Sequence, residues 1–374
     1  GSAAVHLAQA LVSLNLGGSE LVAVELAEFT VAHGDRSTLI AAEGPLGERA
    51  RAAGSGHLDW AIGRKRLSTL AYIRQLQEWL ESERPDVLHA HSRLPAWICR
   101  LALHRMAPAR RPVFITSMHG HYSVSRYSAV RASGDRVVAV SDHRRDYTLH
   151  NDPQTPPERV VTVHGGISHQ AFPFDYRPGP QWFERVYSDF PELQDRKLLC
   201  LPGRLSRYKG HADFIELVAG IRARIPDAHG VIVGKARPGS RYRDELEGLA
   251  ERYGVLDRIT FVGARTDMRD WMAASRLVYS LCADPPEAFG RTVPEALHLG
   301  VPVIAWNHGG VQETLSALFP AGAVTPGDRA QLLERSLAFL KNPPKVEPNS
   351  AFGLAESMQK TMDVYNAALA EKNS

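Results

Sequence analysis

Short apolar segments rich in β-branched residues alternate with helix-like segments along almost the whole chain, and this alternation constrains the fold more than any other feature. A strand is expected at 5–14, and a helix follows it with Val22, Leu26 and Phe29 on one face. Strands alternating with helices form parallel sheets with helices on both faces. Further strands are expected at 37–41, 87–91, 113–117, 136–140, 160–163, 197–201, 230–233, 259–262, 277–281 and 301–306, with helices such as 67–83 and 93–103 between them. The sequence therefore predicts an α/β protein with doubly wound parallel sheets.

The alternation is interrupted between residues 172 and 191 by a stretch rich in Pro and Gly, which is typical of a linker. A chain of 374 residues is long enough for two domains of ordinary size. A second break at 341–348 precedes a terminal helix expected at 355–370. We therefore expect two domains, residues 1–174 and 175–345, followed by a C-terminal helix within 346–374.

Charge and cysteine content exclude several classes of function. The 44 Lys+Arg and 41 Asp+Glu residues give a formal charge of +3, which is too balanced for a dedicated nucleic-acid-binding protein. The three cysteines form no Cys-x-x-Cys pair, so neither a disulfide framework nor a structural zinc site is expected. No apolar run approaches the ~18 residues that a membrane-spanning helix needs. These features predict a soluble protein of a reducing, cytoplasmic compartment.

Two glutamates, Glu287 and Glu295, lie eight residues apart after the strand expected at 277–281. Glu287 falls in a Pro-rich loop and Glu295 at the start of a helix, so both can project into the space beyond one strand. Carboxylates accept paired hydrogen bonds from vicinal hydroxyls such as those of ribose or a hexose. The alternative is that Glu295 only favours the helix dipole and that Glu287 is an exposed loop residue.

A glycine-rich basic turn follows the strand at 197–201. It contains Gly203, Arg204 and Lys209, and a helix begins after it. Glycine permits close backbone approach and a helix start offers amides to an anion, so Arg204 and Lys209 could neutralise a diphosphate. A basic surface turn is the alternative. The spacing fits neither a Walker loop nor Gly-x-Gly-x-x-Gly, which argues against ATPase and dinucleotide-binding functions.

Similar strand-to-helix turns carry weaker signals elsewhere. Gly309-Gly310 follows the strand at 301–306, and Gly17-Gly18 follows the first strand. His119 and His121 end the strand at 113–117, where one of them could hydrogen-bond a substrate hydroxyl; a metal site there lacks an evident third ligand. The chain has no Asp-x-Asp pair, so a metal-chelated diphosphate is not supported.

Taken in order, these segments resemble the retaining glycosyltransferases of family 4, which have the GT-B fold of two Rossmann-like domains facing a central cleft. The resemblance covers nearly the whole chain. It rests on Leu16-Gly-Gly-Ser-Glu20, Asp86-Val-Leu-His-Ala-His91, Thr116-Ser-Met-His119, Val138-Ala-Val-Ser141, Gly203-Arg204 with Lys209-Gly210, Phe261-Val-Gly263, Glu287 with Glu295, and Gly300-Val-Pro-Val with Gly309-Gly310 and Glu313. The stretch His164-Gly165-Gly166-Ile167-Ser168 departs from the family, which usually has Asn-Gly before Val/Ile-Asp.

The resemblance implies a role for each candidate residue. The second domain would bind a nucleotide-sugar donor and the first domain the acceptor, with no cofactor and no metal. Arg204 and Lys209 would hold the donor diphosphate, Glu287 would contact the transferred sugar and His119 would lie near its anomeric carbon. The remaining donor-binding residues implied are Glu295 on the ribose, Phe289, Gly290, Gly203, Gly309 and Gly310 around the sugar and phosphates, Gly17 and Gly18 on the phosphates, and Gly263 and Arg265 at the base.

For the acceptor, the resemblance points to bacterial enzymes of lipopolysaccharide core or related envelope glycans. Residues 1–180 hold 20 Lys+Arg and 17 Asp+Glu, including the basic run 64–66, so charge could attract the protein to an anionic membrane surface. UDP is the expected nucleotide, and a hexose or N-acetylhexosamine the expected sugar. The alternatives are a GT-B epimerase or phosphorylase, a non-catalytic nucleotide-sugar-binding protein, and a Rossmann oxidoreductase, which lacks its fingerprint here.

Overall fold

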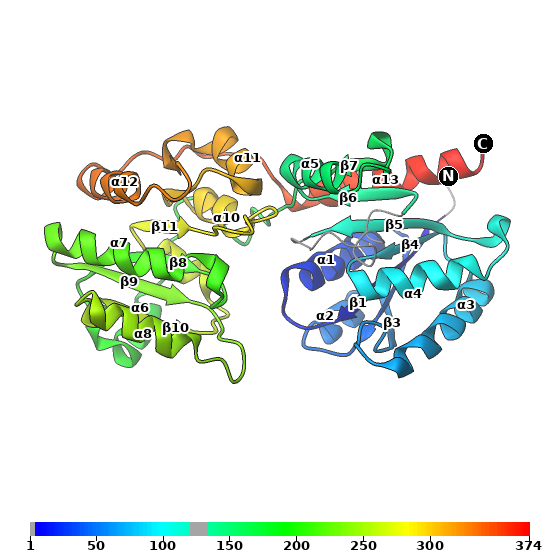
Figure 1. Ribbon diagram of the computed structural model, residues 1–374, viewed down its shortest axis with the longest axis horizontal. Coiled ribbons are helices and arrows are strands. Elements are labelled where there is room, and N and C mark those ends of the chain that lie inside the picture. Colours follow the sequence, from blue (N-terminus) through cyan, green and yellow to red (C-terminus); the bar gives the residue numbers. More distant parts are fainter. Residues whose placement is uncertain (1–3, 120–133) are drawn as a thin grey trace. The chain divides into compact units, whose positions relative to one another are not determined.

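The computed structural model of the protein describes residues 4–119 and 134–374, and the chain divides into two compact units (Figure 1). Unit 1 comprises residues 1–166 and 354–374, and unit 2 comprises residues 167–353. The acceptor and donor roles of the two domains, and the cleft expected between them, stay predictions.

Unit 1 contains a seven-stranded parallel sheet in the order β3-β2-β1-β4-β5-β6-β7. Its strands are β1 (His6–Ser13), β2 (Arg36–Ala42), β3 (Gly56–Asp59), β4 (Val87–Ala90), β5 (Val113–Met118), β6 (Arg136–Ala139) and β7 (Val160–Thr162). Its α-helices are α1 (Gly18–Ala32), α2 (Gly47–Ala52), α3 (Ala71–Glu83), α4 (Arg93–His104), α5 (Asp142–Asn151) and α13 (Leu354–Lys372). The chain order reverses beside β1, which pairs with both β2 and β4.

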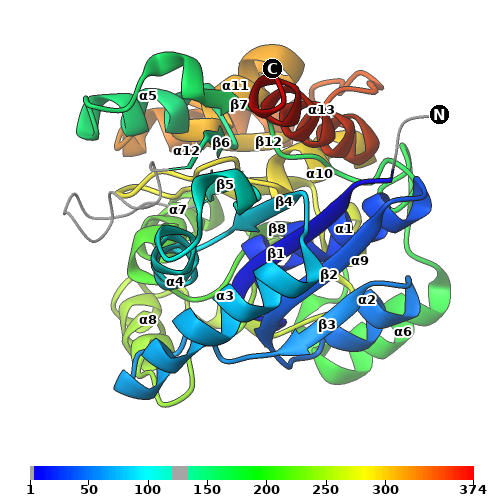
Figure 2. The ribbon, with the colours of Figure 1, turned by 90° about the vertical axis from the view of Figure 1, so that its right-hand side faces the viewer.

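The alternation of buried side chains along each strand of unit 1 puts helices on both faces of the sheet. Ala8 and Leu88 pack with α3 and α4, whereas their neighbours Leu7 and Val87 pack with α1 and α13. Successive strand residues point to opposite faces, so a strand that is apolar throughout needs two helical layers. The C-terminal helix α13 is therefore part of the core of unit 1 (red helix in Figure 2).

Unit 2 contains a six-stranded parallel sheet in the order β10-β9-β8-β11-β12-β13. Its strands are β8 (Lys197–Pro202), β9 (Ala228–Val233), β10 (Ile259–Gly263), β11 (Leu277–Ser280), β12 (Val303–Trp306) and β13 (Ala323–Val324). Its α-helices are α6 (Pro180–Asp189), α7 (His211–Arg224), α8 (Tyr242–Arg252), α9 (Met268–Ala273), α10 (Thr292–Leu299), α11 (Gly309–Leu318) and α12 (Arg329–Lys341). The chain order reverses beside β8, which pairs with both β9 and β11.

The core of unit 2 also has two layers. Leu198 and Cys200 pack with α6, α9, α10 and α11, whereas Leu199 and Leu201 pack with α7, α8 and α12. In such sheets, ligands bind beyond the carboxyl ends of the strands where the strand order reverses. Ligand sites are therefore expected at the carboxyl ends of β1 and β4 in unit 1, and of β8 and β11 in unit 2.

One local prediction from the sequence was wrong. The stretch 172–191 is not all linker, because it contains α6, whose Trp182 and Val186 are buried. Pro180 stands at the first turn of that helix, where its missing N–H costs nothing, so a proline that resembled a linker residue is a helix start.

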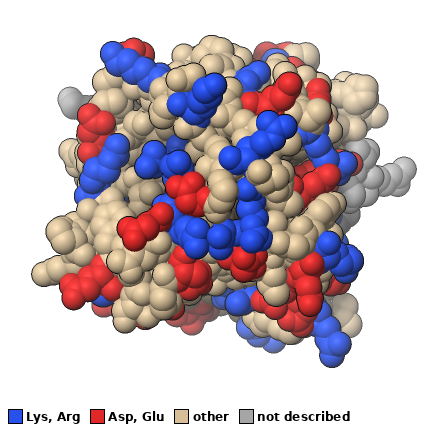
Figure 3. Space-filling view, turned by 90° about the vertical axis from the view of Figure 1, so that its left-hand side faces the viewer, with Lys and Arg blue, Asp and Glu red and all other residues tan. Residues whose placement is uncertain are grey.

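Within the described part of the chain, no helix is both long and apolar enough to cross a membrane. On the face of the molecule drawn in Figure 3, Lys and Arg side chains are interspersed with Asp and Glu. A single-sign field of the kind that attracts nucleic acid is not present on that face.

Candidate functional site

The turn after β8 brings Arg204 and Lys209 to the carboxyl end of the central strand of unit 2. Gly203 has a φ of +130°. A Cβ at Gly234, after β9, would lie 1.9 Å from the Gly203 carbonyl oxygen. Gly210 has a φ of +83°, and a Cβ there would lie 2.1 Å from the Leu281 carbonyl oxygen. Glycine is therefore required for the turn to fold against β9 and β11. Arg204 is exposed, and its guanidinium donates a 2.7 Å hydrogen bond to the Tyr208 hydroxyl.

Lys209 and Glu287 form an ion pair that joins the loop after β8 to the loop after β11. Their side chains are 21% and 24% exposed, so water screens the pair only in part. Burial lowers the pKa of Lys209, but the charge and hydrogen bond of Glu287 outweigh burial, and the net pKa of the ammonium is raised. Lys209 is therefore a cation at neutral pH, held on a carboxylate that a ligand could replace.

The loop that carries Glu287 rests on the first turn of α11. The Gly310 N–H donates a 2.9 Å hydrogen bond to the Glu287 carbonyl oxygen. A Cβ at Gly310 would lie 2.1 Å from the Ala288 carbonyl oxygen, and one at Gly309, where φ is +62°, would lie 2.6 Å from that of Glu287. The glycine pair therefore permits the backbone contact that places the Glu287 loop at a helix N-terminus.

Glu295 lies in the first turn of α10, as the sequence predicts, and is half-buried. Phe289 is 8% exposed, and its ring centroid lies 5.8 Å from that of Phe352. Gly290 has a φ of +81°, and a Cβ there would lie 2.6 Å from the Val311 side chain. The loops after β8, β11 and β12 thus bring most of the predicted donor-binding residues to one edge of the sheet.

Gly263 is the last residue of β10 and Arg265 follows this strand, which is separated from β8 by β9. Arg265 binds the carboxylate of Asp267 through Nε at 3.0 Å and Nη2 at 3.1 Å, and this hydrogen-bonded pair raises the pKa of Arg265. Arg265 and Asp267 line a hollow of about 410 Å³ together with Trp182 and Asp189.

In unit 1, Gly17 and Gly18 stand between β1 and α1. A Cβ at Gly17 would contact only the flexible side chain of Glu20, and a Cβ at Gly18 would meet nothing within 4 Å. The φ of neither residue is positive. The fold therefore does not require glycine at these two positions, which leaves room for the close approach of a ligand.

His119 follows β5 and hydrogen-bonds the ring of His91, which follows β4, over 2.9 Å from Nε2 to Nδ1. The other His91 nitrogen, Nε2, lies 2.7 Å from Oε1 of Gln9 on β1. Gln9 is fully buried and His91 is 2% exposed. From the sequence, the segment containing His91 indicated only the family resemblance, and no pattern pointed to Gln9. His121 lies outside the described residues.

Beside these hydrogen-bonded side chains, His89 stacks on His91 with ring centroids 4.1 Å apart. Its two ring nitrogens meet the hydroxyls of Tyr365, on α13, and Ser117. Burial lowers the pKa of His89 to about 3. Burial also holds the pKa of His91 well below its usual range, and the His89 and His119 rings add to this effect.

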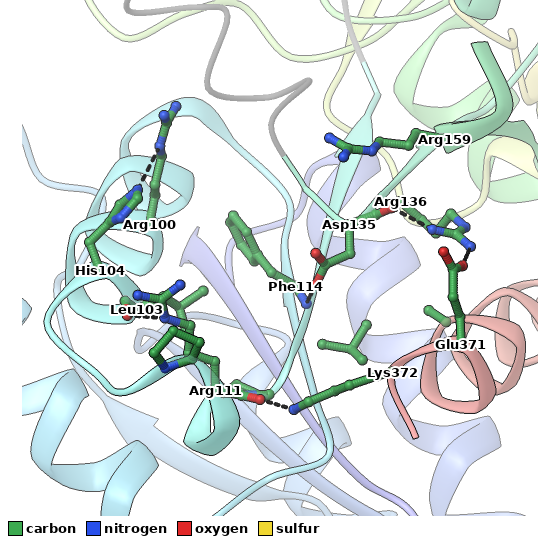
Figure 4. Close-up of a pocket in the computed structure, with 14 residues that line it drawn as sticks. Arg100, Leu103, His104, Arg111, Phe114, Asp135, Arg136, Arg159, Glu371 and Lys372 are labelled. Carbon is green, nitrogen blue, oxygen red and sulfur yellow. Dashed lines mark hydrogen bonds and ion pairs between the residues drawn. The ribbon is translucent and has the colours of Figure 1, made fainter. Parts of the chain in front are cut away.

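A separate pocket of about 580 Å³ lies at the amino ends of β5 and β6, on the opposite edge of the sheet (Figure 4). It is rich in cations, and several of them stabilise local structure: Arg111 donates to the Leu103 carbonyl at the end of α4, and Arg136 pairs with Glu371 of α13. Lys372 donates to the Arg111 carbonyl. This pocket is remote from the strand ends that carry the candidate residues.

Comparison with known proteins gives two family matches along the chain. Residues 16–171 match "Glycosyltransferase Family 4", and residues 185–353 match "Glycosyl transferases group 1". Together these matches span all but the two ends and a short connecting stretch.

Individual proteins are similar over different lengths. D-inositol 3-phosphate glycosyltransferase 1 of Catenulispora acidiphila is 26% identical over 318 residues, which are 76% of this chain and 72% of that protein. The lipopolysaccharide core biosynthesis mannosyltransferase LpsB of Rhizobium meliloti is 30% identical over 165 residues, 43% of this chain and 46% of that protein. The structure of Alr3699/HepE from Anabaena in complex with UDP and glucose superposes with a TM-score of 0.76 at 20% identity and covers 98% of both chains.

Proposed function

The chain belongs to glycosyltransferase family 4, whose members are retaining hexosyltransferases of the GT-B fold that use nucleotide-sugar donors, and we propose a particular class of donor and acceptor for it. We propose that it transfers a hexose or N-acetylhexosamine from a UDP-sugar to a glycan or glycolipid, without a metal. The observation that carries the proposal is the Lys209–Glu287 pair beside Arg204 at the carboxyl ends of β8 and β11.

The two cations suit a diphosphate leaving group. Arg204 and the protonated Lys209 supply positive charge where negative charge develops as the bond to the anomeric carbon breaks, which is where binding lowers a barrier. When the diphosphate takes Lys209, the Glu287 carboxylate is released toward the hydroxyls of the transferred sugar. Two cations at one strand end can do without the divalent ion that an Asp-x-Asp enzyme uses.

The neighbouring residues receive the other parts of the donor. Glu295 accepts hydrogen bonds from the ribose hydroxyls, and the backbone at Gly309 and Gly310, at the start of α11, lies beside the sugar and phosphates, with the Gly310 N–H already bonded to the Glu287 carbonyl oxygen. The remaining assignments are Gly203, Phe289 and Gly290 beside the sugar and diphosphate, Gly263 and Arg265 at the base, Gly17 and Gly18 at the phosphates, and His119 near the anomeric carbon. UDP is favoured because HepE, which shares the fold, was solved with UDP and glucose.

A membrane-borne acceptor is supported by one surface segment of unit 1. Arg64, Lys65 and Arg66 are exposed, and they precede two leucines, Leu67 and Leu70, whose exposed fractions are 88% and 54%. The segment follows β3, so it lies at the edge of the sheet where the carboxyl ends of the strands meet. Exposed leucines beside several cations suit an anionic lipid surface. We therefore propose that the protein acts at the cytoplasmic face of a membrane in the synthesis of lipopolysaccharide core or related envelope glycans, and the name of the LpsB relative, a lipopolysaccharide core biosynthesis mannosyltransferase, supports this proposal.

The donor is tested by thermal unfolding with UDP, GDP, ADP and CMP and their sugar conjugates, with and without EDTA. A donor well above its dissociation constant stabilises the folded state by about 3 kcal/mol. We expect a shift with UDP-sugars that EDTA does not change. A shift that EDTA abolishes would refute the metal-independent site, and no shift with any nucleotide would refute the donor site itself. Product analysis then separates transfer, which lengthens a glycan, from epimerisation or phosphorolysis of the sugar.

The membrane part is tested by flotation with vesicles of anionic or neutral lipid at low salt. We expect retention on anionic vesicles, and its loss in the double variant Leu67→Ser, Leu70→Ser. Leu256→Ser in unit 2, whose side chain is 44% exposed, is the matched control and should float like the unmodified protein. Equal retention of all three proteins on neutral and anionic lipid would contradict the proposal.

A further inference from the structure

A buried chain of polar side chains leads from the core of unit 1 to His119. It runs from Gln9 on β1, through His91 after β4, to His119 after β5, and these three strands are neighbours in the sheet. Buried polar groups are unfavourable unless they are hydrogen-bonded, and apolar side chains would fill the same core more simply. A continuous chain ending at a proposed reaction site therefore calls for a role beyond packing.

A contact with α1 fixes which groups donate and which accept along this series of hydrogen bonds. The Gln9 Nε2 group donates a 3.0 Å hydrogen bond to the Ala23 carbonyl oxygen, which can only accept. The other end of the same amide, Oε1, must therefore face His91. Since this oxygen can also only accept, His91 Nε2 carries a proton.

The proton on His91 Nε2 decides the state of the second nitrogen in the ring. Burial keeps His91 neutral, so its Nδ1 has no proton and accepts a hydrogen bond. The group 2.9 Å from it is His119 Nε2, which must therefore be the donor. With the opposite amide orientation, the Gln9 and Ala23 oxygens would face each other and both rings would carry their protons on the other nitrogen.

We propose that Gln9 and His91 are positioning residues that keep the proton of the neutral His119 ring on Nε2 and its lone pair on Nδ1. The proposal rests on the proposed function in that His119 acts beside the transferred sugar. A ring with a fixed lone pair at one nitrogen presents the same hydrogen-bonding face to every substrate molecule, whereas a ring free to change tautomer does so only part of the time.

The neighbouring His89 ring also helps to fix the orientation of His91. His89 stacks on His91 at 4.1 Å and is itself held by hydroxyls of Ser117 and Tyr365 at its two nitrogens. His91 therefore has one face packed and both nitrogens bonded, so its ring plane is fixed. Tyr365 brings α13 into contact with this stack.

The direct test is long-range ¹H–¹⁵N NMR of the histidine rings in the full chain, which reports the protonated nitrogen of each ring and does not require turnover. We expect Nε2-protonated rings for His91 and for neutral His119. Gln9→Leu keeps the volume but removes the amide, and in this variant His119 should show a mixture of tautomers. A neutral His119 ring protonated on Nδ1, or one unchanged in Gln9→Leu, would overturn the proposal.

A matched pair of variants tests the same point by kinetics. Asn at position 91 can place an oxygen near the position of Nδ1, so His91→Asn keeps an acceptor for His119. Gln reaches instead toward the position of Nε2, so His91→Gln keeps the Gln9 contact and loses the acceptor. We expect kcat to fall by about tenfold or more in His91→Gln at unchanged donor KM, and less in His91→Asn. Equal losses in two folded variants would overturn the proposal.

The two hypotheses fail separately. If His119→Ala retains full transfer activity, His119 has no part in the reaction and the proposed function of this residue is wrong. The NMR measurement on the unmodified protein and on Gln9→Leu still decides where the proton lies. Thermal unfolding of each variant shows whether a loss of activity reflects an unfolded protein.

Discussion

At the residue scale, the candidate donor site combines positions that ordinary folding needs with positions that it does not. Gly210 and Gly310 are required by backbone contacts, whereas the cation of Lys209 could be replaced without harm to the core, since its side chain is only partly buried. The residue that carries the chemistry is therefore separable from the residues that shape the loop. This separation makes Lys209 the informative position for mutation.

Lys209→Ala should lower kcat by about 10²–10³-fold, because the leaving diphosphate loses a partner as its charge develops. The folded state should tolerate the change, although Glu287 loses its partner. Lys197→Ala is the control. Lys197 lies at the amino end of β8, the strand that Lys209 follows, and it forms a 3.5 Å ion pair with Asp227 through a side chain that is 37% exposed. Steady-state transfer with a UDP-sugar measures both. Similar losses in the two variants would show that β8 is merely sensitive to charge.

At the element scale, periodicity predicted most of the structure. The strands expected at 113–117 and 136–140 correspond to β5 and β6, and the helix expected at 67–83 corresponds to a short 3₁₀ turn followed by α3. β3 was not predicted, because Gly56–Asp59 is a partly exposed edge strand without an apolar run. β13 was not predicted because it has only two residues, Ala323–Val324.

For the candidate site, the sequence predicted the individual loops but not the contacts between them. Spacing alone showed that Glu287 follows a strand and that Glu295 begins a helix. It could not show that Lys209 reaches Glu287 or that Gln9 reaches His91, because those contacts join residues 78 and 82 positions apart in the chain. Such pairs depend on the order of strands in the sheet, which local patterns do not encode.

The contact between α11 and the Glu287 loop gives a prediction about glycine. Gly310→Ala should destabilise unit 2 by about 1–3 kcal/mol, because its Cβ would lie 2.1 Å from a backbone oxygen and the loop would have to move. Gly248→Ala is the control: Gly248 lies within α8, where a Cβ would approach nothing closer than 3.7 Å, and alanine should stabilise the helix by about 0.5–1 kcal/mol. Urea unfolding measures both, and a stabilising effect of Gly310→Ala would contradict the close contact.

At the scale of the whole molecule, buried histidines connect folding with pH. Burial lowers the pKa of His229 and of His211 to about 4 and that of His89 to about 3, from 6.5 in the unfolded chain. Between these pH values the unfolded state binds more protons than the folded state. The free energy of unfolding is therefore highest above pH 6.5, and it decreases as the pH falls toward the folded-state pKa values. Each group whose pKa drops to about 4 accounts for about 3 kcal/mol of that loss.

We therefore expect the free energy of unfolding to decrease steadily from pH 7 to pH 4.5. His229→Gln should reduce the slope, because glutamine does not titrate but can keep the hydrogen bond to the Thr260 hydroxyl, which His229 makes over 2.7 Å. Urea unfolding at several pH values gives the slope. An unchanged slope in His229→Gln would mean that folding does not lower the pKa of this histidine.

The largest structural prediction concerns the two chain segments of unit 1. Met358, Met362 and Tyr365 of α13 pack with Leu7, Val87 and Ile115 of the sheet, so residues 1–166 alone leave one face of the sheet without part of its cover. The chain returns close to the point where it left, because the Ile167 N–H donates a 2.8 Å hydrogen bond to the Phe352 carbonyl oxygen. A short linker can therefore join 166 to 354.

We expect a chain of residues 1–166 to be poorly folded and the linked chain 1–166/354–374 to unfold cooperatively, as judged by near-ultraviolet circular dichroism and urea unfolding. In the full-length protein, removal of 354–374 should weaken the unfolding transition of unit 1 and leave that of unit 2, whose two-layered core contains no residue of α13. If residues 1–166 alone were as stable as the linked chain, α13 would be a surface strap. In that case α13 would not be required to close the core of unit 1. The Tyr365–His89 hydrogen bond would then only position the histidine stack.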